Sequence, residues 1–258
     1  MPFCAELFYR HYDGGARSFV YPTILIHGLG GTHLSWPSQV RRINGQHMYA
    51  VDLPGHGLSE ISAHRNVKPI AQKVYQFMSS IGIYSANIVG FSLGGAVAYA
   101  LAQAHPNRIR SLTLIATGNR FNRTEKLCRF FKLLHHRREA MELLMEVGFA
   151  PQTPKNLRRK VLEPLNRVRQ NVLFADCSAS QNFKPAAFSE KAKFPVFLLA
   201  GGEDQISPVA EVRKLKQNFS DVHMEIIPDA GHMLIFERPQ LVKEMLAKFL
   251  KENTAPEY

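Results

Sequence analysis

Short, mostly apolar runs alternate with longer amphipathic stretches along the first 117 residues of the chain. Such runs are typical of strands buried on both faces of a parallel sheet. Between them, residues 68–81 place Ile70, Val74 and Phe77 on one helical face, and the Ala- and Gly-rich residues 93–104 indicate a closely packed helix. The predicted strands are residues 23–27, 48–52, 87–90 and 111–115. This alternation predicts a mostly parallel sheet covered by helices on both faces.

The pattern changes between Gly118 and Lys193. Residues 123–188 show helical spacing without a strand-like run, and three prolines divide them into short helices. The α/β pattern returns with predicted strands at 196–200 and 222–227, and with predicted helices at 209–219 and 240–250. We therefore predict one core, residues 1–117 and 194–258, with a helical cap inserted at residues 118–193.

Composition and length are those of an ordinary globular protein. The chain has 258 residues, of which 45% are hydrophobic and 21% charged, and a chain of this length can bury a core without crosslinks. The cysteines, Cys4, Cys128 and Cys177, are too few and too scattered for a disulfide framework or a zinc site. No leader pattern opens the sequence, and no apolar stretch is long enough to cross a bilayer. We expect a cytoplasmic monomer with no membrane span.

The positive charge is concentrated in the predicted cap. The net charge of the chain is +11, and the segment from Gly118 to Lys193 alone carries 16 Lys and Arg against 7 Asp and Glu. A basic surface can attract nucleic acid, an anionic membrane or an acidic protein. The segment has no recognised nucleic-acid motif and no regular aromatic interleaving, so we expect no nucleic-acid partner.

Gly90-Phe91-Ser92-Leu93-Gly94 follows a predicted strand and precedes a predicted helix. Glycines two residues on either side of a serine permit a sharp strand-to-helix turn that exposes its hydroxyl above the sheet. The pentapeptide alone is also compatible with a tight turn and a capping serine, but its position between strand and helix favours a nucleophile. The amide of Leu93, at the start of the helix, is a candidate oxyanion donor.

A second glycine-rich loop, His27-Gly28-Leu29-Gly30-Gly31, directly follows a predicted strand. Its backbone amides are free to donate, and the amide of Leu29 is the other candidate oxyanion donor. The alternative is a phosphate-binding loop. That alternative lacks both a following Lys-Ser/Thr pair and a complete G-x-G-x-x-G fingerprint.

A serine nucleophile requires a base and a group that orients the base. His232 follows the last predicted strand, and Asp204 follows the strand that ends at Ala200, so both lie at the edge where parallel sheets carry their sites. Glu203 is a weaker alternative orienting group. We interpret Asp52 and His56 as structural parts of a turn rather than as catalytic groups.

With these residues in place, the chain resembles the α/β-hydrolase fold family. The resemblance is carried by His27-Gly28, the segment from Asp52 to Ser59, the segment from Gly90 to Gly95, Asp204, and Gly231-His232, in that order. It implies an eight-stranded, mostly parallel α/β-hydrolase sheet, a catalytic triad of Ser92, Asp204 and His232, and a cap that covers the pocket. Ser92 distinguishes the chain from related dehalogenases and epoxide hydrolases, which have an Asp at that position.

The resemblance implies hydrolysis of a carboxylic ester through an acyl-enzyme, with no metal or organic cofactor. The small cap is similar to that of esterases that demethylate pimeloyl-acyl-carrier-protein methyl ester in biotin synthesis, which suggests an acidic acyl carrier protein as partner. Thioesterase, lactonase, carbon–carbon hydrolase and lyase chemistry remain alternatives, as does a catalytically silent binding protein. The candidate cations for substrate or carrier binding are Arg123, Arg129, Arg137, Arg138, Arg158, Arg159 and Lys160.

Overall fold

The computed structural model describes residues 3–15, 20–188 and 192–253. The predicted core and cap also include residues 1–2, 16–19, 189–191 and 254–258, which lie outside the described residues. Among the described helices, none combines the length and the apolar character that a membrane span requires.

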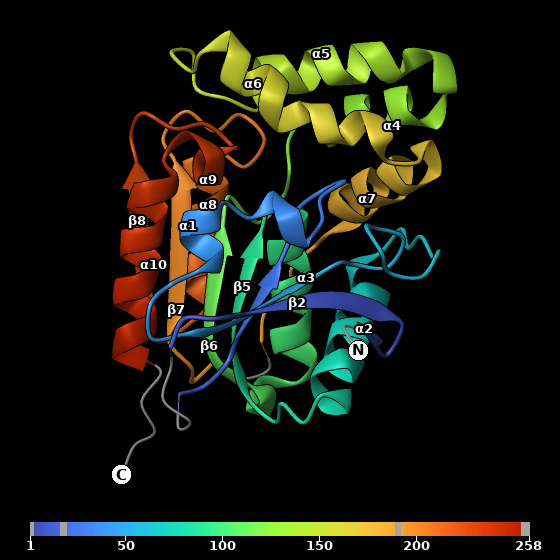
Figure 1. Cartoon of the computed structure of the whole chain (residues 1–258). Coiled ribbons are helices and arrows are strands. Elements are labelled where there is room, and N and C mark those ends of the chain that lie inside the picture. The colour runs from blue at the N-terminus through green and yellow to red at the C-terminus, as the bar shows by residue number, and fades with distance from the viewer. Residues whose placement is uncertain (1–2, 16–19, 189–191, 254–258) are drawn as a thin grey trace.

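A mostly parallel sheet forms the centre of the molecule (Figure 1). Its strand order is β1-β2-β4-β3-β5-β6-β7-β8. Only β1 and β2 run antiparallel to their neighbours, and the strands from β4 to β8 pair in parallel. The strands are β1 (Phe3–Cys4), β2 (Leu7–Asp13), β3 (Thr23–Ile26), β4 (His47–Val51), β5 (Ala86–Phe91), β6 (Ile109–Ile115), β7 (Val196–Gly201) and β8 (Val222–Ile227).

The predicted α/β-hydrolase sheet is therefore confirmed. Its count of eight strands is reached only with β1, a two-residue strand at the edge, and the main sheet consists of the seven strands β2–β8. The patterning of the first 22 residues does not indicate β2, because the second half of that strand is largely exposed and carries the polar residues Arg10, His11 and Asp13. An antiparallel strand near the edge of a sheet does not show the continuous apolar run of a central strand.

Alternate side chains of the central strands enter two separate hydrophobic clusters. In β3, Ile24 and Ile26 pack on one face of the sheet and Leu25 on the other, as the two-residue period of a strand requires. The first cluster includes apolar residues of α2 (Val67–Ser80), α3 (Leu93–Ala104) and α8 (Val209–Leu215). The second includes residues of α1 (Ser38–Arg41), α9 (Leu234–Glu237) and α10 (Pro239–Asn253). Helices thus cover both faces.

Four helices between β6 and β7 lie above the carboxyl ends of the strands (Figure 1). They are α4 (Thr124–Lys132), α5 (Arg137–Val147), α6 (Lys155–Leu162) and α7 (Gln170–Asn182). Pro154 stands directly before α6, and Pro164 falls in a 3₁₀ turn after it, so both prolines interrupt the helical pattern as predicted. The last helix ends at Asn182, six residues before the predicted limit.

Candidate active site

Ser92 occupies a strained turn between β5 and α3. Its backbone has φ 54° and ψ −119°, a conformation that side-chain-bearing residues rarely adopt. A Cβ at Gly90 would collide with the backbone of Gly94 and Gly95, and one at Gly94 would collide with the carbonyl oxygen of Ile26. The two glycines therefore allow the strand, the turn and the helix to pack closely enough to present Ser92.

A chain of hydrogen bonds connects three of the predicted site residues. Ser92 Oγ lies 2.7 Å from His232 Nε2, and His232 Nδ1 lies 2.9 Å from Asp204 Oδ2. All three residues are buried, with Ser92 the most exposed at 9%. A carboxylate only accepts hydrogen bonds, so His232 donates from Nδ1, which leaves Nε2 to accept the proton of the Ser92 hydroxyl. This tautomer is the one that a general base requires.

Asp204 is held in place by the backbone of its own loop. Its Oδ1 accepts hydrogen bonds from the amides of Ile206 and Ser207, both at 2.8 Å, while Oδ2 faces His232. Both oxygens of the carboxylate therefore have partners, and the side chain has no freedom to turn away from the imidazole. Glu203, the alternative orienting residue, has an exposed side chain and is not hydrogen-bonded to His232 in the described residues.

The two candidate oxyanion donors come from two segments, the start of α3 directly after Ser92 and the loop after β3. Leu93 is the first residue of α3, so its amide has no partner inside the helix. In the other loop, the Gly31 amide donates to the Gly28 carbonyl at 3.0 Å and the Gly30 amide donates to Asp176 at 2.7 Å. These bonds hold the loop in shape without using the amide of Leu29. The side chain of Leu29 lines the same cavity as Ser92 and His232.

Comparisons with known proteins identify the family to which this fold belongs. The alpha/beta hydrolase fold family matches residues 21–239. The chain belongs to that family. It is 26% identical over 245 residues to a dihydrolipoyllysine-residue acetyltransferase component of an acetoin cleaving system from Pseudomonas putida, with 90% of this chain and 64% of that protein covered. It is also 26% identical over 257 residues to monoacylglycerol lipase abhd6-A of Xenopus laevis, with 91% and 76% covered.

The fold of this α/β hydrolase is also found among solved structures. An esterase from Exiguobacterium antarcticum superposes with a TM-score of 0.84 at 17% sequence identity, and 95% of each chain is covered. At that identity the similarity concerns the fold. The chain spans only about two thirds of the acetoin-system protein, so the activity of that whole protein does not transfer to it.

Asp52 organises loops in this α/β hydrolase, as the sequence predicted. Its Oδ1 accepts hydrogen bonds from the amide and the Nδ1 of His33, and its Oδ2 accepts one from the amide of Leu58. His27 connects the same loops, because its Nδ1 bonds the Gly28 carbonyl and its Nε2 accepts from the amide of Leu53. Burial, together with the neighbouring His56, lowers the pKa of His27 well below its ordinary value, and the ring is neutral.

Asp176, on cap helix α7, is a site residue that sequence reasoning missed. Its Oδ2 accepts from the Gly30 amide at 2.7 Å and pairs with His56 Nε2 at 2.8 Å. His56 Nδ1 also bonds the carbonyl of Pro54, so both ring nitrogens donate to oxygens. Burial opposes the charge of this ring, but the attraction and hydrogen bond of Asp176 outweigh burial and raise the pKa of His56. A buried ion pair therefore joins the cap to the turn at His56, and the hydrogen bond from Gly30 joins the same carboxylate to the loop of Leu29.

The sequence did contain a signal for Asp176. It is the one acidic residue between Glu163 and Glu190, and it lies among apolar and small residues. A lone carboxylate in such surroundings requires a partner when it is buried. The sequence does not show which of the eleven histidines provides that partner.

Glu237, on α9, is a second missed carboxylate. Its Oε1 accepts from the Ala150 amide at 2.9 Å and from the hydroxyl of Thr153, and its Oε2 accepts from the Gly231 amide at 2.9 Å. Gly231 directly precedes His232. Glu237 thus connects the histidine loop to the cap segment between α5 and α6.

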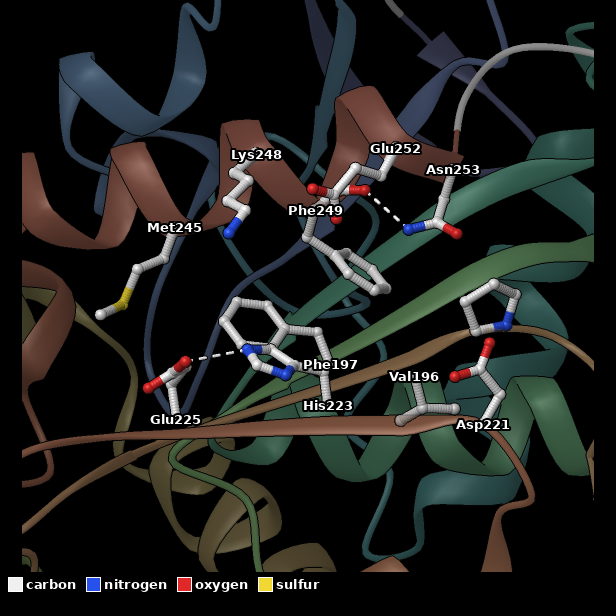
Figure 2. Close-up of a pocket in the computed structure, with 11 residues that line it drawn as sticks. Val196, Phe197, Asp221, His223, Glu225, Met245, Lys248, Phe249, Glu252 and Asn253 are labelled. Carbon is white, nitrogen blue, oxygen red and sulfur yellow. Dashed lines mark hydrogen bonds and ion pairs between the residues drawn. The ribbon is translucent and has the colours of Figure 1, made fainter.

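A small cavity of about 50 Å³ opens beside Ser92 and His232. The cap contributes Leu127, Leu144 and Leu165 to its wall, and the core contributes Leu29 and Phe91. A separate pocket of about 590 Å³ lies between β7, β8 and α10 (Figure 2). That pocket contains an ion pair between His223 and Glu225 at 2.9 Å, and none of the three hydrogen-bonded site residues lines it.

The seven predicted cap cations do not form one surface of free charges. The guanidinium of Arg137 donates to the carbonyls of Leu165 and Val168, and that of Arg158 donates to the carbonyls of Thr153, Met145, Ala150 and Pro151. Arg138 forms an ion pair with Glu142 at 2.9 Å. Arg137 and Arg158 therefore hold the cap together, and the remaining exposed candidates are Arg123, Arg129, Arg159 and Lys160.

Proposed function

We propose that this protein is a serine esterase that cleaves carboxylic esters through an acyl-enzyme on Ser92. The observation that carries the proposal is the unbroken hydrogen-bond chain from Ser92 through His232 to Asp204. Family membership supports hydrolase chemistry, and the monoacylglycerol lipase among its relatives supports an ester substrate.

The mechanism follows from the order of the three hydrogen-bonded side chains. His232 Nε2 accepts the proton of the Ser92 hydroxyl as the oxygen attacks the ester carbonyl, and Asp204 stabilises the imidazolium that forms. The amides of Leu29 and Leu93 stabilise the oxyanion, each by on the order of 3 kcal/mol. His232 then gives its proton to the leaving alcohol. In the second half, a water loses a proton to His232 and attacks the acyl-enzyme. His232 then returns that proton to the Ser92 oxygen as the bond to the acyl group breaks, which releases the acid and restores the enzyme.

A pre-steady-state assay with 4-nitrophenyl acetate tests the proposal. We expect a burst of nitrophenol from the wild type and none from Ser92→Ala. Ser180→Ala is the matched control, because Ser180 lines the same cavity but donates to the carbonyl of Asp176 instead of a histidine. A wild type that hydrolyses no ester, thioester or lactone would contradict the esterase proposal and leave a carbon–carbon hydrolase, a lyase or a silent binding protein as the alternatives.

A more specific version of the proposal is that the ester is carried by an acidic acyl carrier protein. The excess of Lys and Arg in the segment from Gly118 to Lys193 favours such a partner. The test of the carrier hypothesis reverses the charge of three exposed cap residues in the variant Arg123→Glu/Arg129→Glu/Arg159→Glu. The KM for a carrier-linked ester, such as the methyl ester of pimeloyl-acyl carrier protein, should rise while the KM for a free short ester stays the same. Equal changes in KM for both substrates would contradict the carrier-protein hypothesis.

A further inference from the structure

A second, larger groove adjoins the cavity at Ser92. Its volume is about 710 Å³, within the range of small-molecule sites. On one side it is bounded by the loop of Leu29 and by α1, and on the other by α6 and the 3₁₀ turn Glu163–Arg167. It shares Leu29, Phe91, Leu165 and Met233 with the small cavity, so the two spaces meet at those four side chains. The groove is therefore the space next to the Ser92 cavity that a longer ligand would occupy.

The groove combines apolar walls with positive charge. Trp36, Phe236 and Val161 contribute to the walls, and three of the lining residues are cationic: Arg41, Lys160 and Arg167. Among the described residues that line the groove, none is Asp or Glu. Charge of one sign on low-dielectric walls concentrates the field and favours a ligand group of the opposite sign.

The cations of the groove differ from those that hold the cap together. Lys160 and Arg167 are exposed, and neither forms an ion pair with a described residue. Arg41 donates from Nη1 to the Tyr12 hydroxyl at 3.1 Å, while its Nε is buried without a hydrogen-bond partner in the described part of the chain. Lys160 and Arg167 therefore remain able to bind an anion, whereas the guanidinium groups of Arg137 and Arg158 are occupied by backbone carbonyls.

We propose that the outer groove binds a carboxylate or phosphate carried by the leaving alcohol of the substrate. The inference rests on the proposed esterase function and specifies its substrate class, which is a short acyl ester of an anionic alcohol. The small cavity of about 50 Å³ takes the acyl group, and the groove takes the alcohol. Hydrolysis adds one water across the ester bond and releases the free acid and the anionic alcohol from the groove.

Two pairs of matched esters separate charge from shape. Acetyl-glycerol phosphate and glycerol monoacetate differ by a phosphate, and the acetate esters of 4-hydroxybenzoic acid and of its methyl ester differ by a carboxylate. The test variant is Lys160→Gln/Arg167→Gln. The control is Lys132→Gln/Lys155→Gln, which removes two exposed charges from the same cap at positions that do not line the groove.

We expect the ratio of the KM of the charged ester to that of its neutral partner to rise about tenfold in the test variant, because two partly screened ion pairs are lost. The ratio should stay at the wild-type value in the control, and added salt should reduce the wild-type preference. The pair that shows the larger change identifies phosphate or carboxylate as the preferred group. An unchanged ratio in the test variant, or equal changes in both variants, overturns the inference while the esterase function stands.

Calorimetry of alcohol binding gives a readout that needs no catalysis. Glycerol 3-phosphate and 4-hydroxybenzoate are titrated into wild type, test variant and control. The neutral analogues are glycerol and methyl 4-hydroxybenzoate. If either anion binds the wild type more tightly than its neutral analogue, and only the test variant loses this preference, the result supports the anion site even if the protein hydrolyses no ester. Absence of any anion preference in the wild type contradicts it. A preference seen only for a carrier-linked ester assigns the charge to a protein partner and also overturns the small-molecule reading.

Discussion

The loops at the carboxyl edge of the sheet and the cap above them contribute to the site in different ways. The edge loops carry Ser92, Asp204 and His232, which follow the ends of β5, β7 and β8 by one, three and five residues. The cap acts through contacts distant in sequence: Asp176 is 146 residues from Gly30 and 120 from His56. The proposed chemistry therefore belongs to the core, whereas the cap holds the loop of Leu29 through Asp176 and lines the space above it.

The largest effect is expected from a change confined to the edge loops. Asp204→Asn keeps the size of the side chain but allows His232 to bond it in the wrong tautomer, with Nε2 protonated. We expect kcat on a short ester to fall about 10³- to 10⁴-fold with little change in stability. Glu203→Gln, at the neighbouring exposed carboxylate, should leave kcat near the wild-type value. Similar losses in both variants would show that the assignment of the orienting group is wrong.

An intermediate effect is expected where the cap meets the core. Asp176→Asn leaves the His56 ring without its counter-ion, so the free energy of unfolding should fall by about 3 kcal/mol, as for other broken buried pairs. Because Asp176 also holds the Gly30 amide, kcat should fall by on the order of tenfold. Glu163→Gln, at an exposed cap carboxylate, serves as the control in denaturant unfolding and in the kinetic assay. An unchanged kcat would limit Asp176 to a structural role.

The smallest effect concerns pH. The pKa of His56 is raised in the folded protein, so its ion pair stabilises the fold fully below the unfolded pKa of about 6.5 and loses this contribution as the pH rises through the folded pKa. The pKa of His27 is lowered, so its contribution has the opposite sign and is lost as the pH falls. The stability difference between wild type and His56→Gln should be larger at pH 5.5 than at pH 8.5. A difference that grows with pH would contradict the charged pair.

The two regions also differ in how far the sequence predicts them. Ser92 and the sharp strand-to-helix turn that carries it are predictable from the local sequence. Gly90 and Gly94 belong to the same pentapeptide, and they allow the close approach of chain segments that the turn requires. Asp204 and His232 follow from chain order and from the direction of parallel strands. Asp176 and Glu237 could not be paired with their partners, because helical periodicity carries no information about contacts between distant segments.

The cap cations illustrate the same limit. A count of Lys and Arg predicted a basic surface, but the count does not separate Arg158, which bonds four backbone carbonyls, from Lys160, which lines the groove two residues later. Arg41 and Arg167 were not among the predicted cations, since Arg41 belongs to the core and Arg167 to a turn. Only the folded arrangement brings them to one groove.

The central claim is that Ser92 is the nucleophile, and covalent labelling tests it most directly. The protein is incubated with a fluorophosphonate, digested and analysed by mass spectrometry to locate the modified residue. We predict one phosphonyl group per chain on Ser92, much slower labelling in His232→Ala, and no labelling at that position in Ser92→Ala. An unmodified wild type, or a modified residue other than Ser92, would contradict the account.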